Sequence, residues 1–331
     1  MEFNTLPGAL RPYGIRSGQG PRHLIGGMVA SLYATRAETD NQFTLAMLTG
    51  GRDAGLPMVK HAASHIGLFV LDGGLEVLTE AGIWTLHRGD YASIPAGTVY
   101  GYRMTRLRNV VMCFATGEAG NAFAAAPAYD GFVQPEQGAG TWRDAAITSR
   151  DTTVIGDHPA GLAALSLRSE LPKWTEAYAI ESGAGTHLLV SDQLFTFAGG
   201  NAQTNDTFLT LLTEGPAGDM IPPHMHRLHD EMFFCLDGQI DMKAGDEIIS
   251  LFPGDFLFVP RLTPHAYQFK APYTRILGWL MPGIFEPFFY TLGDPTDLTV
   301  YPQQPAPFRF DRVIAKLDQL DIVPLGKPAG H

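Results

Sequence analysis

The chain has 331 residues, 45% of them hydrophobic and 17% charged, which is typical of a globular protein and long enough for two domains. The formal net charge of −11 argues against nucleic acid or an anionic membrane as a partner, because both attract positive surfaces. No apolar run approaches the roughly 20 residues of a membrane helix, and no signal-peptide pattern is visible at the start. We therefore expect a cytoplasmic protein in which Cys113 and Cys235 are buried, reduced thiols.

Short strands separated by turns are expected along the first half of the chain. Alternating apolar and polar residues indicate the strands, and turn signals such as Asp72-Gly73-Gly74 separate them. After an extended piece at 11–16, the predicted strands are 31–34, 43–48, 66–71, 75–79, 83–86, 91–94, 100–104 and 110–114. The segment 118–180 is rich in Ala, Gly and Pro, and we expect it to hold a short helix near 121–125 and the connection between domains.

The same pattern then repeats with a constant offset of 165 residues. The matching pairs include His61/His226, Gly73/Gly238, Gly89/Gly254, Pro95/Pro260 and Tyr102/Tyr267. A repeat this long indicates a duplicated domain. Two copies of a short-stranded unit predict an all-β chain of two tandem jelly-roll barrels with a few short helices. We expect the N-terminal barrel at 1–150 and the C-terminal barrel at 151–331.

Apolar residues recur with helical spacing near the end of the second copy. They predict a helix over 311–320. The simplest interpretation is a surface helix packed on the C-terminal barrel, and the alternative is a helix that binds a partner.

A stretch of the second copy carries candidate metal ligands. His224 and His226 are two residues apart, which places them on the same face of a strand. Glu231 follows at an odd spacing, so we expect a turn or bulge within 227–230 that brings it to the same side. With His265 from a separate segment, three imidazoles and one carboxylate favour one divalent first-row transition metal, namely Cu, Fe, Ni, Mn, Co or Zn. The alternative is a strand-rich segment with surface histidines.

These spacings resemble the two cupin motifs, G-x5-H-x-H-x3,4-E-x6-G and G-x5-P-x-G-x2-H. The first motif reads Gly218, His224, His226, Glu231 and Gly238. The second reads Gly254, Pro260 and His265, with Leu262 in place of the middle glycine. The chain is therefore similar to the bicupins, which implies two tandem double-stranded β-helix (jelly-roll) barrels.

The first copy lacks most of these ligand types. Val59, Ile66 and Tyr100 stand where the second copy has His224, Glu231 and His265, and only His61 has a counterpart. We therefore expect a metal-free N-terminal barrel and a metal in the C-terminal barrel. A rearranged site of His61, His65 and Tyr100 is the alternative, and no motif spacing supports it.

Three further residues of the second copy are ambiguous. By strand alternation Phe233 shares the face of Glu231, and Tyr267 shares that of His265. Both are candidates for lining a pocket for a flat aromatic substrate, and the alternative is ordinary barrel core. His229 lies in the expected turn, where it is either solvated, orients a neighbour or replaces Glu231 as a ligand.

Strings around the motifs are similar to those of the quercetinases. They are Arg11-Pro12-Tyr13-x-Ile15-Arg16, the stretch Pro223 to Glu231 and the stretch Pro282 to Gly293. The resemblance implies a bicupin dioxygenase that opens the ring of a flavonol with O2 as co-substrate and releases carbon monoxide. It also implies His224, His226 and His265 as metal ligands, with Glu231 as both ligand and the base that accepts the substrate hydroxyl proton.

Other functions use the same four ligands. A decarboxylase, lyase, isomerase or biosynthetic tailoring enzyme would carry them, as would a dioxygenase for another polyhydroxylated aromatic or enolic substrate. A non-enzymatic storage or ligand-sensing bicupin is less consistent with an intact ligand set. We expect a small aromatic molecule as partner. A homodimer stays open, because two barrels in one chain already mimic the dimer of single cupins.

Overall fold

The computed structural model describes residues 1–131, 150–245 and 247–325. It is built mainly of strands, and it divides into two compact units. We call residues 5–10 and 18–184 the N-terminal barrel, and residues 1–4, 11–17 and 185 onward the C-terminal barrel. Among the described residues, none of the helices has the length and apolar character needed to span a bilayer.

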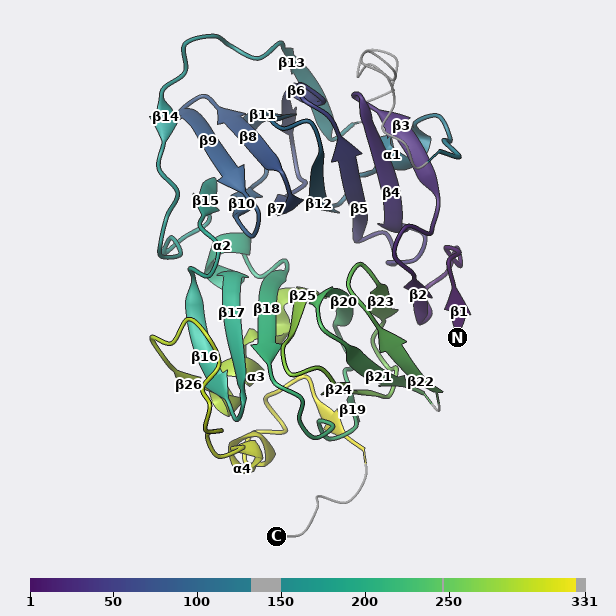
Figure 1. The fold of residues 1–331 in the computed structure, drawn as a ribbon, viewed down its shortest axis with the longest axis vertical. Helices are drawn as coiled ribbons and strands as arrows, with labels where there is room; N and C mark the ends of the chain where they lie inside the picture. The colour runs from purple at the N-terminus through teal and green to yellow at the C-terminus, as the bar shows by residue number, and fades with distance from the viewer. Residues whose placement is uncertain (132–149, 246, 326–331) are drawn as a thin grey trace. The chain divides into compact units, whose positions relative to one another are not determined.

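The N-terminal barrel is formed by two sheets (Figure 1). One has the strand order β15-β10-β7-β12-β5-β4-β3 and the other β13-β6-β11-β8-β9-β14. Its elements are β3 (Arg22–Ile25), β4 (Met28–Ala34), β5 (Phe43–Gly50), β6 (Gly55–His61), β7 (Ile66–Asp72), β8 (Gly74–Thr79), β9 (Gly82–His87), β10 (Tyr91–Ile94), β11 (Val99–Met104), β12 (Asn109–Thr116), α1 (Asn121–Ala125), β13 (Thr152–Gly156), β14 (Ala164–Leu165) and β15 (Tyr178–Ile180).

The C-terminal barrel repeats this arrangement and adds helices. Its sheets have the orders β1-β2-β23-β20-β25-β18-β17-β16-β26 and β22-β21-β24-β19-β27. Its elements are β1 (Glu2–Phe3), β2 (Tyr13–Ile15), β16 (Thr186–Val190), β17 (Gln193–Gly199), α2 (Asn201–Thr204), β18 (Leu209–Gly215), β19 (His224–Met225), β20 (Asp230–Asp237), β21 (Ile240–Ala244), β22 (Glu247–Leu251), β23 (Phe256–Val259), β24 (His265–Phe269), β25 (Thr274–Met281), η1 (Gly283–Phe285), α3 (Glu286–Leu292), β26 (Asp294–Pro295), α4 (Phe310–Ile314) and β27 (Val323–Pro324).

The two copies exchange their first strands. Strand β2 pairs with β23 of the C-terminal barrel, and its counterpart β15, 165 residues later in the sequence, pairs with β10 of the N-terminal barrel. Figure 1 shows the purple β2 beside the green β23. Each copy therefore completes the sheet of the other. Because of this exchange, and because β13 and β14 also pair with β6 and β9 of the N-terminal barrel, the compact units differ from the expected division into 1–150 and 151–331.

One turn clamps each exchanged strand. In the C-terminal barrel the Asp255 carboxylate accepts hydrogen bonds from the backbone N–H of Ser17 at 2.8 Å and the guanidinium of Arg16 at 2.7 Å. Asp90 accepts from the backbone N–H of Ser182 at 2.8 Å in the same way. Gly254 has φ +92°, and a Cβ there would lie 2.4 Å from Ser17 Oγ, so this turn needs glycine.

The structure refines the predicted elements. The strands expected between residues 31 and 114 are present, and the short helix at 121–125 is α1. The predicted helix over 311–320 is wrong in length, because α4 ends at Ile314 and tighter turns follow, including Gln319 N–H to Lys316 O at 2.9 Å. Strand β6 was missed, because Pro57 interrupts the strand pattern there. Cys113 and Cys235 are buried and free.

We predict that the Asp255 clamp stabilises the C-terminal barrel. Asp255→Ala leaves Arg16 and the backbone N–H groups of Ser17 and Phe252 without this acceptor. The free energy of unfolding should fall by about 2–4 kcal/mol, measured by chemical denaturation followed by circular dichroism. The control is Asp294→Ala, whose exposed ion pair with Arg312 should contribute at most about 0.5 kcal/mol. Equal denaturation midpoints for the two variants would contradict the clamp.

Candidate metal centre and cavity

The four predicted ligand residues come from both sheets of the C-terminal barrel. His224 of β19 lies opposite His265 of β24 in the same sheet. Glu231 lies on β20 of the other sheet, paired with β23 and β25. The chain crosses from one sheet to the other through a turn after β19, as expected for 227–230. We call His224, His226, Glu231 and His265 the ligand cluster.

Backbone carbonyl groups orient all three imidazoles of the ligand cluster. Nδ1 of His224 lies 2.8 Å from Pro222 O, Nδ1 of His265 lies 2.9 Å from Thr263 O, and Nδ1 of His226 lies 2.7 Å from Asp321 O. A carbonyl oxygen only accepts, so each Nδ1 donates to its carbonyl group and each Nε2 is the ring nitrogen left to face the ligand cluster. Metal-binding histidines are usually fixed by such a bond on the other ring nitrogen.

The Glu231 carboxylate faces these Nε2 atoms. Its Oε2 lies 3.0 Å from Nε2 of His265, and its Oε1 lies 3.5 Å from Nε2 of His226. Burial would raise the pKa of Glu231, but the imidazoles of His226, His229 and His265 outweigh burial and hold this pKa well below its ordinary value. Glu231 is therefore an ionised carboxylate at neutral pH.

Burial disfavours the charged form of two of the imidazoles. It lowers the pKa of His224 to about 4, with His265 acting in the same direction. It also holds the pKa of His226 well below the ordinary value. Neutral imidazoles and an ionised carboxylate are the protonation states that metal binding requires.

The three histidines of the ligand cluster lie close enough together to share one metal ion. One ligand atom from each of His224, His226 and His265 lies within 4.8 Å of the other two. Nε2 of His226 is fully buried with no hydrogen-bond partner among the described residues, an expensive state for a polar atom unless an ion is coordinated there. The donor set of imidazole nitrogens and a carboxylate suits a divalent first-row transition metal.

Asp321 stabilises the turn between His226 and Glu231 through hydrogen bonds. No motif in the sequence marks Asp321. Its carboxylate accepts hydrogen bonds from the backbone N–H groups of Arg227, Leu228 and His229 at 2.9, 3.0 and 3.2 Å. Its backbone carbonyl accepts from His226. Strand β27, which follows Asp321, pairs with β19. The C-terminal segment therefore fixes the ligand-bearing turn from outside the barrel motifs.

His229 is a buried neighbour of the ligand cluster and is not solvated. Its Nδ1 lies 2.7 Å from Asp321 Oδ2, and its Nε2 lies 3.5 Å from Glu231 Oε1. Burial alone would lower the pKa of His229, but the hydrogen bond with Asp321 and the Glu231 carboxylate outweigh it and raise this pKa. The atoms of His226, His229 and Asp321 also meet the distance criterion for a metal site. Asp321 is already engaged by the turn, so the ligand cluster is the better donor set.

The corresponding place in the N-terminal barrel is filled. Val59, Ile66 and Tyr100 belong to its buried apolar core. Nε2 of His61, the atom equivalent to a ligand nitrogen, lies 3.0 Å from the hydroxyl of Tyr100. Nε2 of His65 lies 2.7 Å from the Ser93 hydroxyl. Among the described residues, the groups with metal-binding geometry lie in the C-terminal barrel.

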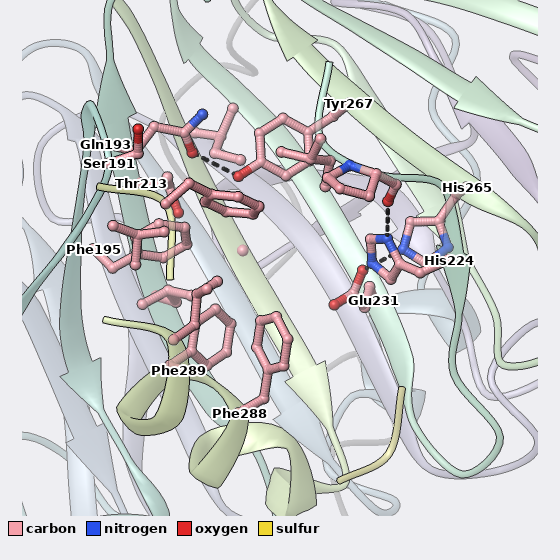
Figure 2. Close-up of a pocket in the computed structure, with 18 of the residues that line it drawn as sticks. Ser191, Gln193, Phe195, Thr213, His224, Glu231, His265, Tyr267, Phe288 and Phe289 are labelled. Carbon is pink, nitrogen blue, oxygen red and sulfur yellow. Dashed lines mark hydrogen bonds and ion pairs between the residues drawn. The ribbon is translucent and has the colours of Figure 1, made fainter. Parts of the chain in front are cut away.

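A cavity of about 710 Å³ in the C-terminal barrel adjoins the ligand cluster (Figure 2). His224, Glu231 and His265 lie at its wall, and Phe233 and Tyr267 line it, although both are also part of the apolar core. The Pro282 to Gly293 stretch forms η1 and α3, whose aromatic residues line the cavity. They are Phe285, Phe288 and Phe289.

Phe285 joins the cavity wall to the ligand cluster. Its ring centroid lies 4.5 Å from that of His226 and 4.4 Å from that of His229. On its other side Phe288 stacks on it, with the ring planes 12° apart and the centroids separated by 4.3 Å. The stacked rings of Phe285 and Phe288 therefore lie beside the ligand cluster.

Two comparisons agree with this architecture. Residues 211–273 match the family model described as a cupin domain. A solved salicylate 1,2-dioxygenase from Pseudaminobacter salicylatoxidans has a similar fold, with a TM-score of 0.53 at 13% identity, covering 80% of this chain and 80% of that chain. At that identity the likeness concerns the fold alone.

Curated relatives give a closer match in sequence. Quercetin 2,3-dioxygenase of Bacillus subtilis (strain 168) is 38% identical over 327 residues, which cover 96% of this chain and 97% of that protein. Quercetin 2,3-dioxygenase of Aspergillus japonicus is 34% identical over 125 residues, or 35% of this chain and 36% of that protein. On the near-complete match to the first, the chain belongs to the quercetin 2,3-dioxygenase family and is a dioxygenase with two cupin barrels.

Proposed function

We propose that the C-terminal barrel holds one divalent first-row transition metal through His224, His226, His265 and Glu231. We further propose that the protein uses O2 there to open the ring of a flavonol or a related polyhydroxylated aromatic molecule, with release of carbon monoxide. The observation that carries the proposal is the convergence of three Nε2 atoms and one ionised carboxylate beside an aromatic cavity. The membership of the quercetin 2,3-dioxygenase family supports the reaction type.

A bound divalent cation would make an enolic hydroxyl of the substrate more acidic and link the substrate electronically to O2. The protein supplies a proton acceptor and fixes the orientation of the imidazole rings. Glu231 is ionised and lies at the cavity wall, so its free lone pairs can accept the proton of a substrate hydroxyl that approaches the ligand cluster. The Nδ1 bonds to carbonyl oxygens keep each imidazole from rotating away from this point.

The cavity favours a flat, uncharged ring system. Phe233, Phe288 and Phe289 offer aromatic surfaces that a ring can contact. Among the described lining residues none is Lys or Arg, whereas Asp192 and Asp219 are present. A carboxylate substrate such as oxalate would therefore find no side-chain cation in the cavity, which argues against oxalate decarboxylation as the reaction.

Substitutions in the two barrels should have different effects on metal content. We predict about one ion per chain for the wild type, measured by elemental analysis after loading and gel filtration. His226→Ala should retain less than about a tenth of that amount, because three donors compete poorly with water and buffer. The matched control is His61→Ala, the equivalent change in the N-terminal barrel, which should keep the full content. A loss of metal in His61→Ala instead would contradict a site in the C-terminal barrel.

The carboxylate of Glu231 should be needed for turnover. Glu231→Gln keeps the size of the side chain but removes its charge and most of its basicity, so kcat for a flavonol should fall by at least about 100-fold. O2 uptake and release of carbon monoxide measure this, with both rates divided by metal content. Glu76→Gln, on β8 of the N-terminal barrel, is the control and should retain wild-type rates. If the wild type leaves flavonols untouched, the proposed reaction is wrong.

Asp321 should determine how firmly the metal is held. In Asp321→Ala the backbone N–H groups of the turn and Nδ1 of His229 lose their acceptor. Loss of such a supporting group typically costs about 10–100-fold in metal affinity, which competition with a chromophoric chelator measures. Asp318→Ala, an exposed change in the same segment, is the control. Equal affinities in the two variants would show that the hydrogen bonds to Asp321 do not support the metal.

A further inference from the structure

A hydrogen-bonded pair of polar side chains lies in the wall of the cavity. The hydroxyl of Tyr267 donates a hydrogen bond to Oε1 of Gln193 at 2.6 Å. Both residues line the cavity, with exposed fractions of 9% and 8%. Figure 2 shows Gln193 at the side of the cavity away from His224 and Glu231, with the Tyr267 hydroxyl pointing toward it. Neither residue belongs to the ligand cluster, and the proposed chemistry leaves the pair unused.

The pair retains unused hydrogen-bonding capacity. Tyr267 is protonated at neutral pH and donates to Gln193, so its oxygen still has a lone pair to offer. Within the part of the chain that the structure describes, the two N–H groups of the Gln193 side chain have no partner. One acceptor and one donor therefore lie side by side. A phenolic hydroxyl complements both, because it can donate to the Tyr267 oxygen and accept from Gln193 at the same time.

Strand geometry fixes the separation between this pair and the ligand cluster. Tyr267 follows His265 by two residues on β24, so their side chains leave the same face roughly 7 Å apart. The Phe233 ring is a neighbour of both, with its centroid 6.4 Å from the His265 ring and 6.4 Å from the Tyr267 ring. A flat molecule that reaches the ligand cluster with one ring and lies along Phe233 would direct its remote ring toward the pair.

Negative charge near the Gln193–Tyr267 pair affects which substituents of a bound molecule are favoured there. Asp192, next to Gln193 in sequence, lines the cavity together with Asp219. Two carboxylates disfavour an anionic substituent at this end of the cavity, whereas they tolerate a neutral hydroxyl donor. The lining therefore favours phenols over carboxylates, sulfates or phosphates.

We propose that Gln193 and Tyr267 form a subsite that recognises a hydroxyl group on the ring remote from the metal-chelating group. The inference rests on the proposed function and narrows its substrate class to neutral flavonols, or similar polyphenols, that carry hydroxyl groups beyond the chelating one. Gln193 and Tyr267 are then specificity residues, because they touch the substrate away from the reacting atoms.

The test compares two flavonols on the metal-loaded enzyme. Quercetin carries hydroxyl groups on both outer ring systems, whereas 3-hydroxyflavone keeps only the chelating hydroxyl. The wild type should prefer quercetin in kcat/KM by about tenfold or more, since the hydroxyl satisfies a buried donor and acceptor. In Gln193→Met and in Tyr267→Phe this preference should fall to within about threefold of unity, mainly through a higher KM for quercetin. Gln19→Met, an exposed change outside the cavity, should keep the wild-type preference.

Two results would overturn the subsite. One is an unchanged preference in both variants, and the other is a parallel loss on both flavonols, which is what a purely structural role would give. Anaerobic fluorescence titration of the same proteins separates this inference from the proposed reaction. A wild type that binds quercetin with a preference dependent on Gln193, yet consumes no O2, would refute the reaction and support the subsite. A wild type that binds neither flavonol would refute both.

Discussion

The direction of three imidazole rings is the constraint on which the centre depends. Each ring donates from Nδ1 to a main-chain carbonyl oxygen, and this directs the Nε2 atoms of His226 and His265 toward Glu231. Two of these carbonyl groups belong to the residues two positions before the histidines, and the third belongs to Asp321. Because the acceptors are backbone atoms, the tautomers are set by the fold itself and not by a further titratable side chain.

The two copies of the duplicated domain differ at the positions of the proposed metal ligands. The N-terminal copy keeps His61 but has Val59, Ile66 and Tyr100 at the other ligand positions. These three side chains fill the interior as core, and the Tyr100 hydroxyl satisfies the one imidazole that remains. A barrel interior packed in this way is stable without an ion, whereas the C-terminal interior contains a buried carboxylate and imidazoles that an ion would stabilise.

Local patterns predicted much of this molecule, and their limits are physical. Alternation located most strands, the constant offset identified the duplication, and the odd spacing to Glu231 predicted the turn after His226. Asp321 and Gln193 were not predicted, because they lie about 95 and 74 residues from their partners His226 and Tyr267 and no local signal marks such contacts. The predicted C-terminal helix is longer than α4, because the apolar spacing continues into the turns that lead the chain to Asp321.

The exchange of β2 and β15 makes each half of the chain depend on a strand from the other half. Splitting the gene at the middle of the connecting segment would give two polypeptides, each with a surplus strand and an unprotected sheet edge. The unpaired N–H and C=O groups of such an edge can pair with a strand of another chain. Transfer of the half with the proposed metal centre to another protein would therefore require circular permutation, with the strand around Tyr13 moved to a new position in the sequence.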